Sequence, residues 1–271
     1  MLVRIKIPYL NGRRSGVIMV AFGSDLGQAG RVWAGQRTEA AVSLATGNDM
    51  GKSVTIVMLQ HGADTGVYIP PALRLANPQA TIVVVPAHQN LDLPAHVDGI
   101  VLGGSPLSLV DAGHPELGFI RPEAELLRRL MDQGMPILGI CFGHQLLAHI
   151  FGGQVSRAAT PEYGSTEVHW HTDGQIHRIF QCHEDEVSVE PEGTTVVASS
   201  PDCRVQALRF DGLPVFSVQS HPEIDRSVIH RRIAELESHG LTVNQVTTVD
   251  DDFCHGIYRS FFDQVEAVRS A

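Results

Sequence analysis

Apolar and polar positions alternate along the chain in two rhythms from about residue 54 onward. Short β-branched apolar runs of buried-strand length are separated by segments whose apolar residues recur every three or four positions. The runs predict strands over 54–60, 80–87, 97–106 and 135–140, and the intervening segments predict helices over 70–77, 122–134 and 143–153. This alternation with short connections predicts an α/β protein whose open, mostly parallel sheet is flanked by helices.

The pattern changes after Gly153. Short, often alternating runs separated by turns predict a small antiparallel β section, with strands over 165–172, 177–182, 186–190, 194–200, 205–210 and 214–220. Two helices then close the chain, over 226–240 and 251–268, the second with acidic residues at its start that favour a helix N-terminus. We expect this β section to carry or flank the functional site.

Residues 1–53 follow neither rhythm clearly. A strand and turn over 16–24 and a short helix over 37–45 are the elements that we expect there, among scattered Gly and Ala. We interpret 1–53 as an N-terminal extension of unknown role, and 54–271 as one catalytic domain.

Composition narrows the class of protein. With 43% hydrophobic and 18% charged residues, the chain of 271 residues has the composition of a globular protein. A net charge of −10 and the lack of a Lys/Arg run argue against nucleic-acid binding. No apolar stretch approaches the roughly 20 residues of a membrane helix, and the N-terminus is a poor signal peptide. Four widely spaced cysteines then read as free thiols, so we expect a cytoplasmic enzyme.

One cysteine lies where a predicted strand turns into a predicted helix. The stretch "PILGICFGHQLL" places Cys141 at the carboxyl end of a strand, the edge at which α/β sheets bind ligands, with Gly139 and Gly143 on either side. A following helix favours a thiolate, and the amide of Phe142 is suitably placed to bind an oxyanion. The glycine turn at 103–106 is a candidate second donor. A buried structural cysteine explains the local pattern equally well.

A thiolate nucleophile normally needs an imidazole that is oriented by an acceptor. In "QSHPEI" an apolar strand ends at His221, and Glu223 can return to the imidazole across a tight turn. His144 is the rival base, but on the helix after the cysteine it is expected to point away from the thiol. Two imidazoles at 169–171, with His177 and His183 nearby, could begin a metal site, but their spacing matches no recognised set, so we expect no metal.

Five motifs together resemble those of the class I glutamine amidotransferases, in particular a stand-alone glutaminase of the GMP-synthase-like branch. They are "GIVLGGSP" (99–106), "GICFGHQ" (139–145), "PEYGS" (161–165), "CHEDEV" (182–187) and "QSHPEI" (219–224), and they occur in the order of that family. The resemblance implies a flavodoxin-like sheet. Two positions depart from the family pattern: Ser105 stands where a glycine is usual, and Cys182 where a serine is usual.

The resemblance also implies roles for individual residues. Cys141 would attack the side-chain amide of glutamine, His221 would carry the proton to the departing ammonia, and Glu223 would orient His221. The amide of Phe142 and one amide of the Gly104–Ser105 turn would form the oxyanion hole. The substrate would be held by Gln145, Tyr163, Gly164, His183 and Asp185.

Three functions remain open at this point. The first is hydrolysis of glutamine to glutamate and ammonia without a cofactor, the ammonia passing to a separate synthetase partner, because the chain has no Ser-Gly-Gly-x-x-Ser or P-loop for activating an acceptor. The second keeps the triad but cleaves another γ-glutamyl amide or conjugate without an ammonia acceptor. The third is a non-catalytic binding subunit that retains the fold.

Overall fold

The computed structural model describes residues 2–7, 16–21, 53–62, 65–88, 91–111 and 117–271. The chain divides into two compact units, Met1–Ala40 and Ala41–Ala271. In the first, β1 (Leu2–Ile7) pairs antiparallel with β2 (Gly16–Ala21), which confirms the strand expected near 16–24. The helix expected over 37–45 lies outside the described residues.

The second unit is built on a nine-stranded sheet with the order β4-β3-β5-β6-β11-β10-β9-β7-β8. Its first half is parallel, and every strand carries the β-branched and aliphatic residues that a sheet covered on both faces requires. The strands are β3 (Thr55–Gln60), β4 (Thr81–Pro86), β5 (Gly99–Leu102), β6 (Ile137–Ile140) and β11 (Val215–Val218). The predicted open sheet of the α/β class is therefore confirmed.

The other half of the sheet is antiparallel and continuous with the first. It consists of β10 (Ala207–Phe210), β9 (Thr194–Ser199), β7 (Gln154–Trp170) and β8 (Gln175–Val189). The prediction of separate strands over 177–182 and 186–190 is wrong, because β8 runs unbroken through both. The polar residues between them alternate between buried and half-buried positions along the strand, so pairing with β7 continues without a turn.

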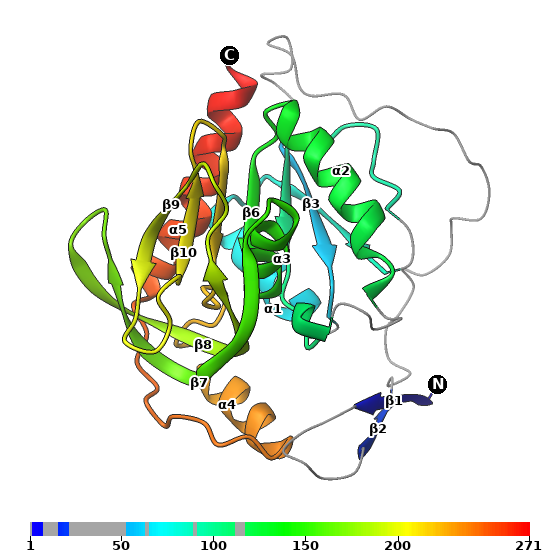
Figure 1. Cartoon of the computed structure of the whole chain (residues 1–271). Helices are drawn as coiled ribbons and strands as arrows, with labels where there is room; N and C mark the ends of the chain where they lie inside the picture. The colour runs from blue at the N-terminus through cyan, green and yellow to red at the C-terminus, as the bar shows by residue number, and fades with distance from the viewer. Residues whose placement is uncertain (1, 8–15, 22–52, 63–64, 89–90, 112–116) are drawn as a thin grey trace. The chain divides into compact units, whose positions relative to one another are not determined.

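Helices cover both faces of the sheet (Figure 1). On one face, α2 (Ile120–Asp132) and α3 (Phe142–Ile150) share a buried core with one set of strand residues. On the other, α1 (Thr65–Ala76) and α5 (Asp251–Arg269) pack on the alternate set. A third, smaller core lies under α4 (Ile229–Ser238), which runs close to β7 and β8. No helix among the described residues combines the length and apolar character of a membrane span.

The predicted start of the first helix at residue 70 is wrong. Helix α1 begins at Thr65 and contains Pro70 and Pro71 in its interior. Each proline removes a helical N–H donor, which weakens an isolated helix. The adjacent Ile69 and Leu73 are fully buried against the sheet, and this packing holds the helix together in spite of the missing hydrogen bonds.

Candidate active site at the turn between β6 and α3

Cys141 occupies a strained turn between strand β6 and helix α3. Its backbone has φ 53° and ψ −105°, and it is the only non-glycine residue with positive φ in the described part of the chain. Such a conformation costs on the order of 1–3 kcal/mol for a residue with a side chain. The Cys141 N–H donates to the carbonyl of Val218 (2.8 Å), so pairing with the end of β11 holds the turn in place. Strain of this kind is typical of a nucleophile raised above a sheet edge.

Two glycines permit the turn, as the sequence predicts. A Cβ on Gly143 would lie 2.4 Å from the carbonyl oxygen of Leu102, at the end of β5. A Cβ on Gly139 would lie 2.8 Å from the carbonyl oxygen of Gly143. The start of α3 is thus pressed against the end of β5, where the turn at 103–106 begins. Phe142 is the first residue of α3, so its N–H has no partner within the helix.

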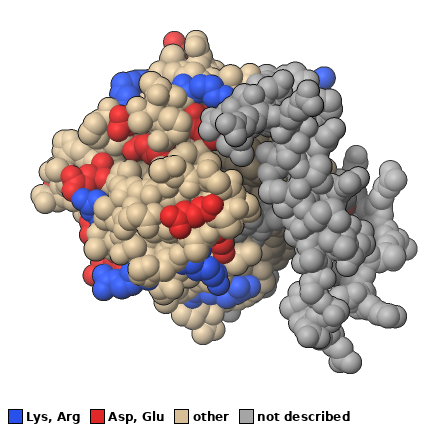
Figure 2. Space-filling view, turned by 90° about the horizontal axis from the view of Figure 1, so that it is seen from below, with Lys and Arg blue, Asp and Glu red and all other residues tan. Residues whose placement is uncertain are grey.

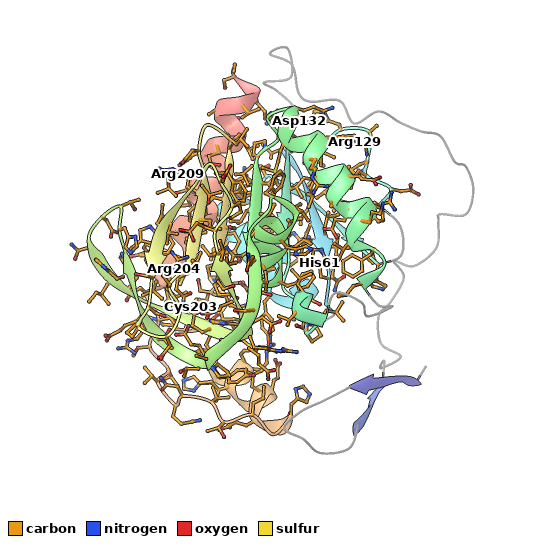
Figure 3. The ribbon with its side chains drawn as sticks, viewed as in Figure 1. His61, Arg129, Asp132, Cys203, Arg204 and Arg209 are labelled. Carbon is orange, nitrogen blue, oxygen red and sulfur yellow. The ribbon has the colours of Figure 1, made fainter. Side chains whose placement is uncertain are left out.

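The turn after β5 is fixed by a buried histidine that sequence reasoning missed. His61 lies just beyond the end of β3 (Figure 3). It contacts the carbonyl of Gly103 through Nδ1 (3.1 Å) and Glu123 through Nε2 (2.8 Å). The Ser105 hydroxyl donates to the His61 carbonyl (3.2 Å) and accepts from the N–H of Leu107 (3.1 Å). The serine that departs from the family pattern therefore uses its side chain to brace this turn. In the sequence, the only indication of this role is that His61 is a polar residue directly after the end of a predicted strand.

His221 and Glu223 form a buried pair at the end of β11. Their closest atoms, Nδ1 of His221 and Oε1 of Glu223, are 2.7 Å apart, and both residues are less than 9% exposed. The His221 backbone N–H donates to the carbonyl of Phe180 (2.8 Å), which fixes the backbone beneath the ring. Tyr258 on α5 donates to the other carboxylate oxygen of Glu223 (3.4 Å). Sequence reasoning missed Tyr258, because its helical spacing marks it only as a core residue.

The second ring nitrogen of His221, Nε2, is available to interact with the thiol of Cys141. Nε2 is buried and meets no nitrogen or oxygen partner among the described residues. Burial by itself lowers the pKa of His221, but the charge of Glu223, followed by the charge and hydrogen bonding of Cys141, raises it well above the usual value. The structure therefore brings together the three residues that the sequence nominates for catalysis.

Two glutamines connect the thiol to the strand β8. Nε2 of Gln145 donates to the carbonyl of Asp185 (2.9 Å) and to Oε1 of Gln219 (3.1 Å). Gln219 in turn donates through Nε2 to Sγ of Cys141 (3.8 Å). Gln145, the expected substrate contact, is thus separated from the thiol by one side chain. Gln219 lies within the histidine motif, but sequence reasoning did not identify it as a neighbour of the nucleophile.

The segment expected to line the substrate pairs with the part of β8 that contacts Cys141. Residue Tyr163 of β7 pairs with Cys182 of β8, and the carbonyl of Cys182 accepts from Sγ of Cys141 at 3.7 Å. The Tyr163 hydroxyl donates to Glu184 (2.5 Å). Gly164 has φ +104°, and a Cβ there would lie 2.6 Å from the carbonyl oxygen of Asn244. Tyr163 and Gly164 are therefore held at the edge of the site by β8 and by the chain around Asn244.

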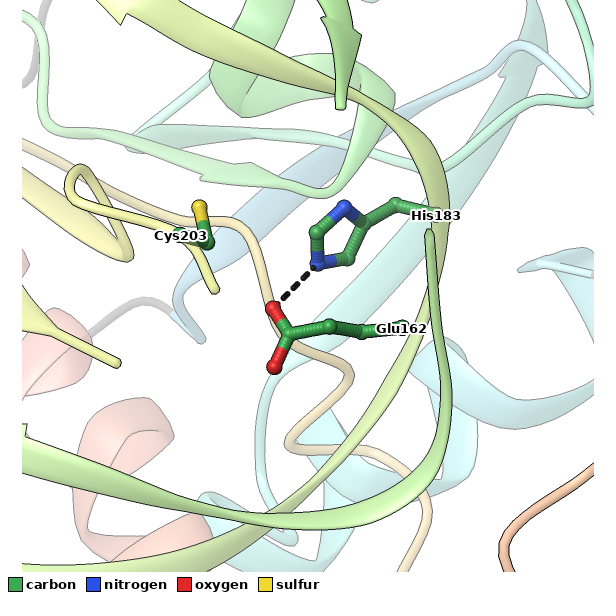
Figure 4. Close-up of side chains that lie close together, drawn as sticks. All are labelled: Glu162, His183 and Cys203. Carbon is green, nitrogen blue, oxygen red and sulfur yellow. Dashed lines mark hydrogen bonds and ion pairs between the residues drawn. The ribbon is translucent and has the colours of Figure 1, made fainter. Parts of the chain in front are cut away.

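His183 belongs to a buried polar cluster rather than to an open pocket wall. Its Nε2 contacts Glu162 (3.1 Å) and its Nδ1 contacts the carbonyl of Asp185 (3.1 Å), whose carboxylate pairs with Arg157 (2.9 Å). Possible ligand atoms of Glu162, His183 and Cys203 lie within 4.8 Å of one another (Figure 4). Burial, followed by the charge of Glu162, raises the pKa of the Cys203 thiol. We interpret the cluster as a hydrogen-bonded support under β7 and β8.

The rings of His169 and His171 lie edge-on to each other at a centroid distance of 5.2 Å, whereas His171 and His177 also make contacts with other residues. His171 bonds the carbonyl of Val196 (3.2 Å) and the hydroxyl of Ser199 (2.9 Å). His177 pairs with Asp173 (2.9 Å) and stacks on Phe253 at a ring distance of 3.6 Å. The structure does not bring these rings together with His183 as a set of ligands.

His144 is a buried support of the fold. Its Nδ1 contacts the Ser217 hydroxyl (2.8 Å), its Nε2 contacts the carbonyl of Val205 (3.2 Å), and none of its surface is exposed. The ring therefore bridges α3 to β11 and to the segment before β10, away from the thiol. This placement agrees with the expectation that His144 is not the base.

The buried His144 should make the protein less stable in acid. Burial lowers its pKa to about 3, whereas an unfolded histidine titrates near 6.5. Between these values the unfolded chain binds a proton that the folded chain does not, so the free energy of unfolding falls as the pH falls. The variant His144→Gln should flatten this dependence by up to about 1.4 kcal/mol per pH unit. Urea unfolding at pH 4, 5, 6 and 7 measures it. The exposed His239→Gln is the control, and equal slopes in all three proteins would contradict the prediction.

The fold and the site define an α/β protein in which a cysteine lies beside a buried histidine–carboxylate pair at the carboxyl edge of a parallel sheet. The sequence profile of the family described as "Glutamine amidotransferase class-I" matches residues 49–241. The chain belongs to this family, and the resemblance seen in its motifs is confirmed.

Individual relatives agree with this assignment. A glutamine-hydrolysing GMP synthase component of Saccharolobus solfataricus is 34% identical over 152 residues, which cover 54% of this chain and 77% of that protein. A protein of Thermoplasma acidophilum, described as a putative GMP synthase component, has a solved structure with a TM-score of 0.60 and 25% identity, covering 80% of this chain and 96% of that one. A glutamine amidotransferase of Thermotoga maritima shares the fold with a TM-score of 0.66, 20% identity and coverage of 79% and 98%.

Proposed function

We propose that this chain hydrolyses the side-chain amide of glutamine through a Cys141–His221–Glu223 triad and delivers ammonia to a separate synthetase partner. The observation that carries the proposal is the buried pair of His221 and Glu223 at 2.7 Å, beside a cysteine held in a strained turn. A carboxylate at Nδ1 keeps a neutral imidazole in the tautomer whose Nε2 can accept a proton from the thiol.

The reaction proceeds in two halves. The sulfur of Cys141 attacks the amide carbon, and the C–N bond breaks as His221 gives the thiol proton to the departing nitrogen. This step releases ammonia and leaves a γ-glutamyl thioester. Water, deprotonated by His221, then attacks the thioester carbon, and the C–S bond breaks to give glutamate and the free thiol. The N–H of Phe142 and an N–H of the Gly104–Ser105 turn stabilise the oxyanion in both halves.

The pocket residues support recognition of glutamine. Tyr163 and Gly164 lie on a strand whose neighbour presents the Cys182 carbonyl to the thiol. Behind them, Gln145 and His183 both contact the carbonyl of Asp185 (2.9 and 3.1 Å), and these contacts hold β8 in place beside the site.

The partner and the substrate class are proposed on two further observations. Relatives described as glutamine-hydrolysing components of GMP synthase motivate the proposal of a synthetase partner. On the face in Figure 2, the described basic side chains lie among acidic ones rather than in one continuous patch, so this face offers no electrostatic footprint for nucleic acid.

A glutaminase assay with mass spectrometry tests the proposal. Purified protein, alone and with candidate synthetases, should release glutamate from glutamine, and Cys141 should carry a covalent adduct after treatment with an electrophilic glutamine analogue. Simple γ-glutamyl amides and conjugates, assayed in parallel, identify a different γ-glutamyl substrate. If no condition releases glutamate and Cys141 acquires no adduct, the chain is a non-catalytic binding protein and the proposal is wrong.

A further inference from the structure

Helix α4 carries an arginine close to the proposed substrate pocket. Nη2 of Arg232 lies 3.9 Å from Sγ of Cys182, and the Arg232 side chain is only 12% exposed. Cys182 is the residue whose carbonyl contacts Sγ of Cys141 at 3.7 Å. The Cys182 thiol is also within range of the charges of His221, Arg232 and Cys141. It therefore lies between the guanidinium group and the catalytic pair.

We propose that Arg232 binds the α-carboxylate of the substrate and so restricts the enzyme to γ-glutamyl amides that carry this group. The proposal rests on the proposed glutaminase function and adds a residue that determines specificity. A guanidinium group forms strong, directional hydrogen bonds with a carboxylate. A cysteine sulfur is only a weak acceptor, so a carboxylate that reached Nη2 would make a stronger contact there than Cys182 does.

The distances suit the length of glutamine. The two contacts of Cys182 place Nη2 of Arg232 no more than about 12 Å from Sγ of Cys141, given the covalent size of one residue. An attacked amide carbon lies about 3–3.5 Å from its nucleophile. The chain from that carbon to a carboxylate oxygen adds about 6 Å, and a charge-assisted hydrogen bond adds about 2.8 Å. The total reach of about 12 Å is therefore sufficient to span this distance.

Neighbouring side chains hold Arg232 in position. Its Nη1 donates to Glu235 (3.2 Å), which also accepts from the Tyr68 hydroxyl (2.9 Å) and pairs with Arg231 (3.6 Å). Glu235 thus ties two arginines and a phenol together. Ile229 and Ile233 of α4 are buried, and they anchor this helix in the core that also contains Phe180 of β8. The guanidinium group is therefore positioned before substrate arrives, which lowers the entropic cost of binding.

Steady-state kinetics of the full chain provide the first test. For L-glutamine, Arg232→Gln should raise KM about 10- to 100-fold, as expected for loss of a charge-assisted hydrogen bond, with kcat changed less than about threefold because the reacting atoms are untouched. Arg232→Lys should recover part of the loss. L-Glutaminamide, which lacks the α-carboxylate, should be cleaved equally by the wild type and Arg232→Gln. The matched control is Arg231→Gln, whose side chain is 58% exposed. An unchanged KM for L-glutamine in Arg232→Gln would overturn the proposal.

Labelling of Cys141 provides a readout without turnover. A chloroketone analogue of glutamine with a free α-carboxylate should label Arg232→Gln about 10- to 100-fold more slowly than the wild type, while iodoacetamide should label both at the same rate. Equal slowing with both reagents would mean a disturbed site and would overturn the assignment. A wild-type protein whose Cys141 reacts with neither reagent would instead refute the proposed glutaminase function, and with it this inference.

Discussion

Replacement of Cys141 by serine should abolish glutamate release, with kcat lower by at least about a thousandfold. Serine fits the space, but its hydroxyl is far less acidic than a thiol, and the proposed imidazole base would have to remove a much more tightly held proton. The same variant should lose the covalent adduct formed by the glutamine analogue. Glutamate production followed by a coupled assay, with intact-mass analysis of the treated protein, measures both effects.

Stability measurements separate this loss from misfolding. Cys141→Ser keeps the strained backbone at φ 53° and should unfold at a temperature close to that of the wild type. Cys141→Gly relieves a strain on the order of 1–3 kcal/mol and should be at least as stable as the wild type, although equally inactive. Unchanged turnover in Cys141→Ser would place the nucleophile at another residue.

The parallel half of the fold was predictable because its signals are local. Runs such as 54–60 and 135–140 are too apolar and β-branched for a surface position, and the glycines that flank Cys141 mark a turn in which side chains do not fit. The long hairpin of β7 and β8 was less predictable. Its strands carry Pro161, Gly164 and many charged residues, and they are strands because they pair with each other rather than because of their own propensity.

In the candidate site, contacts between residues close in the sequence were likewise predictable, and contacts between distant residues were not. His221 and Glu223 are two residues apart, so a tight turn already indicates that they can meet. Tyr258 lies 35 positions from Glu223, and His61 lies 62 positions from Glu123. Such contacts depend on how the helices pack against the sheet, and residue type alone does not determine that packing. The start of α1 was misjudged for a related reason, because burial of Ile69 outweighed the two prolines beside it.

Replacement of His221 by alanine should lower kcat for glutamine by about 10²- to 10⁴-fold, the range typical of a lost general base. His144→Ala should instead reduce stability, because the ring spans Ser217 and Val205, and should leave the folded fraction active. Turnover per folded molecule, obtained from activity and unfolding data on the same samples, distinguishes the two histidines. Activity lost only in His144→Ala would overturn the proposed triad.

The proposed role of Glu223 can be tested through its effect on the pKa of His221. Burial lowers the pKa of His221, while Glu223 is the larger of the two charges that raise it. In Glu223→Gln the raising charge is gone, so the pKa of His221 should fall, and the limb of the pH–rate profile that reports the imidazole should move to lower pH. Proton NMR of the His221 ring measures the shift directly. Tyr258→Phe, which removes a 3.4 Å contact to the carboxylate but no charge, is the matched control and should change it little. An unaltered titration in Glu223→Gln would mean that the carboxylate does not govern the base, and its role in the triad would have to be abandoned.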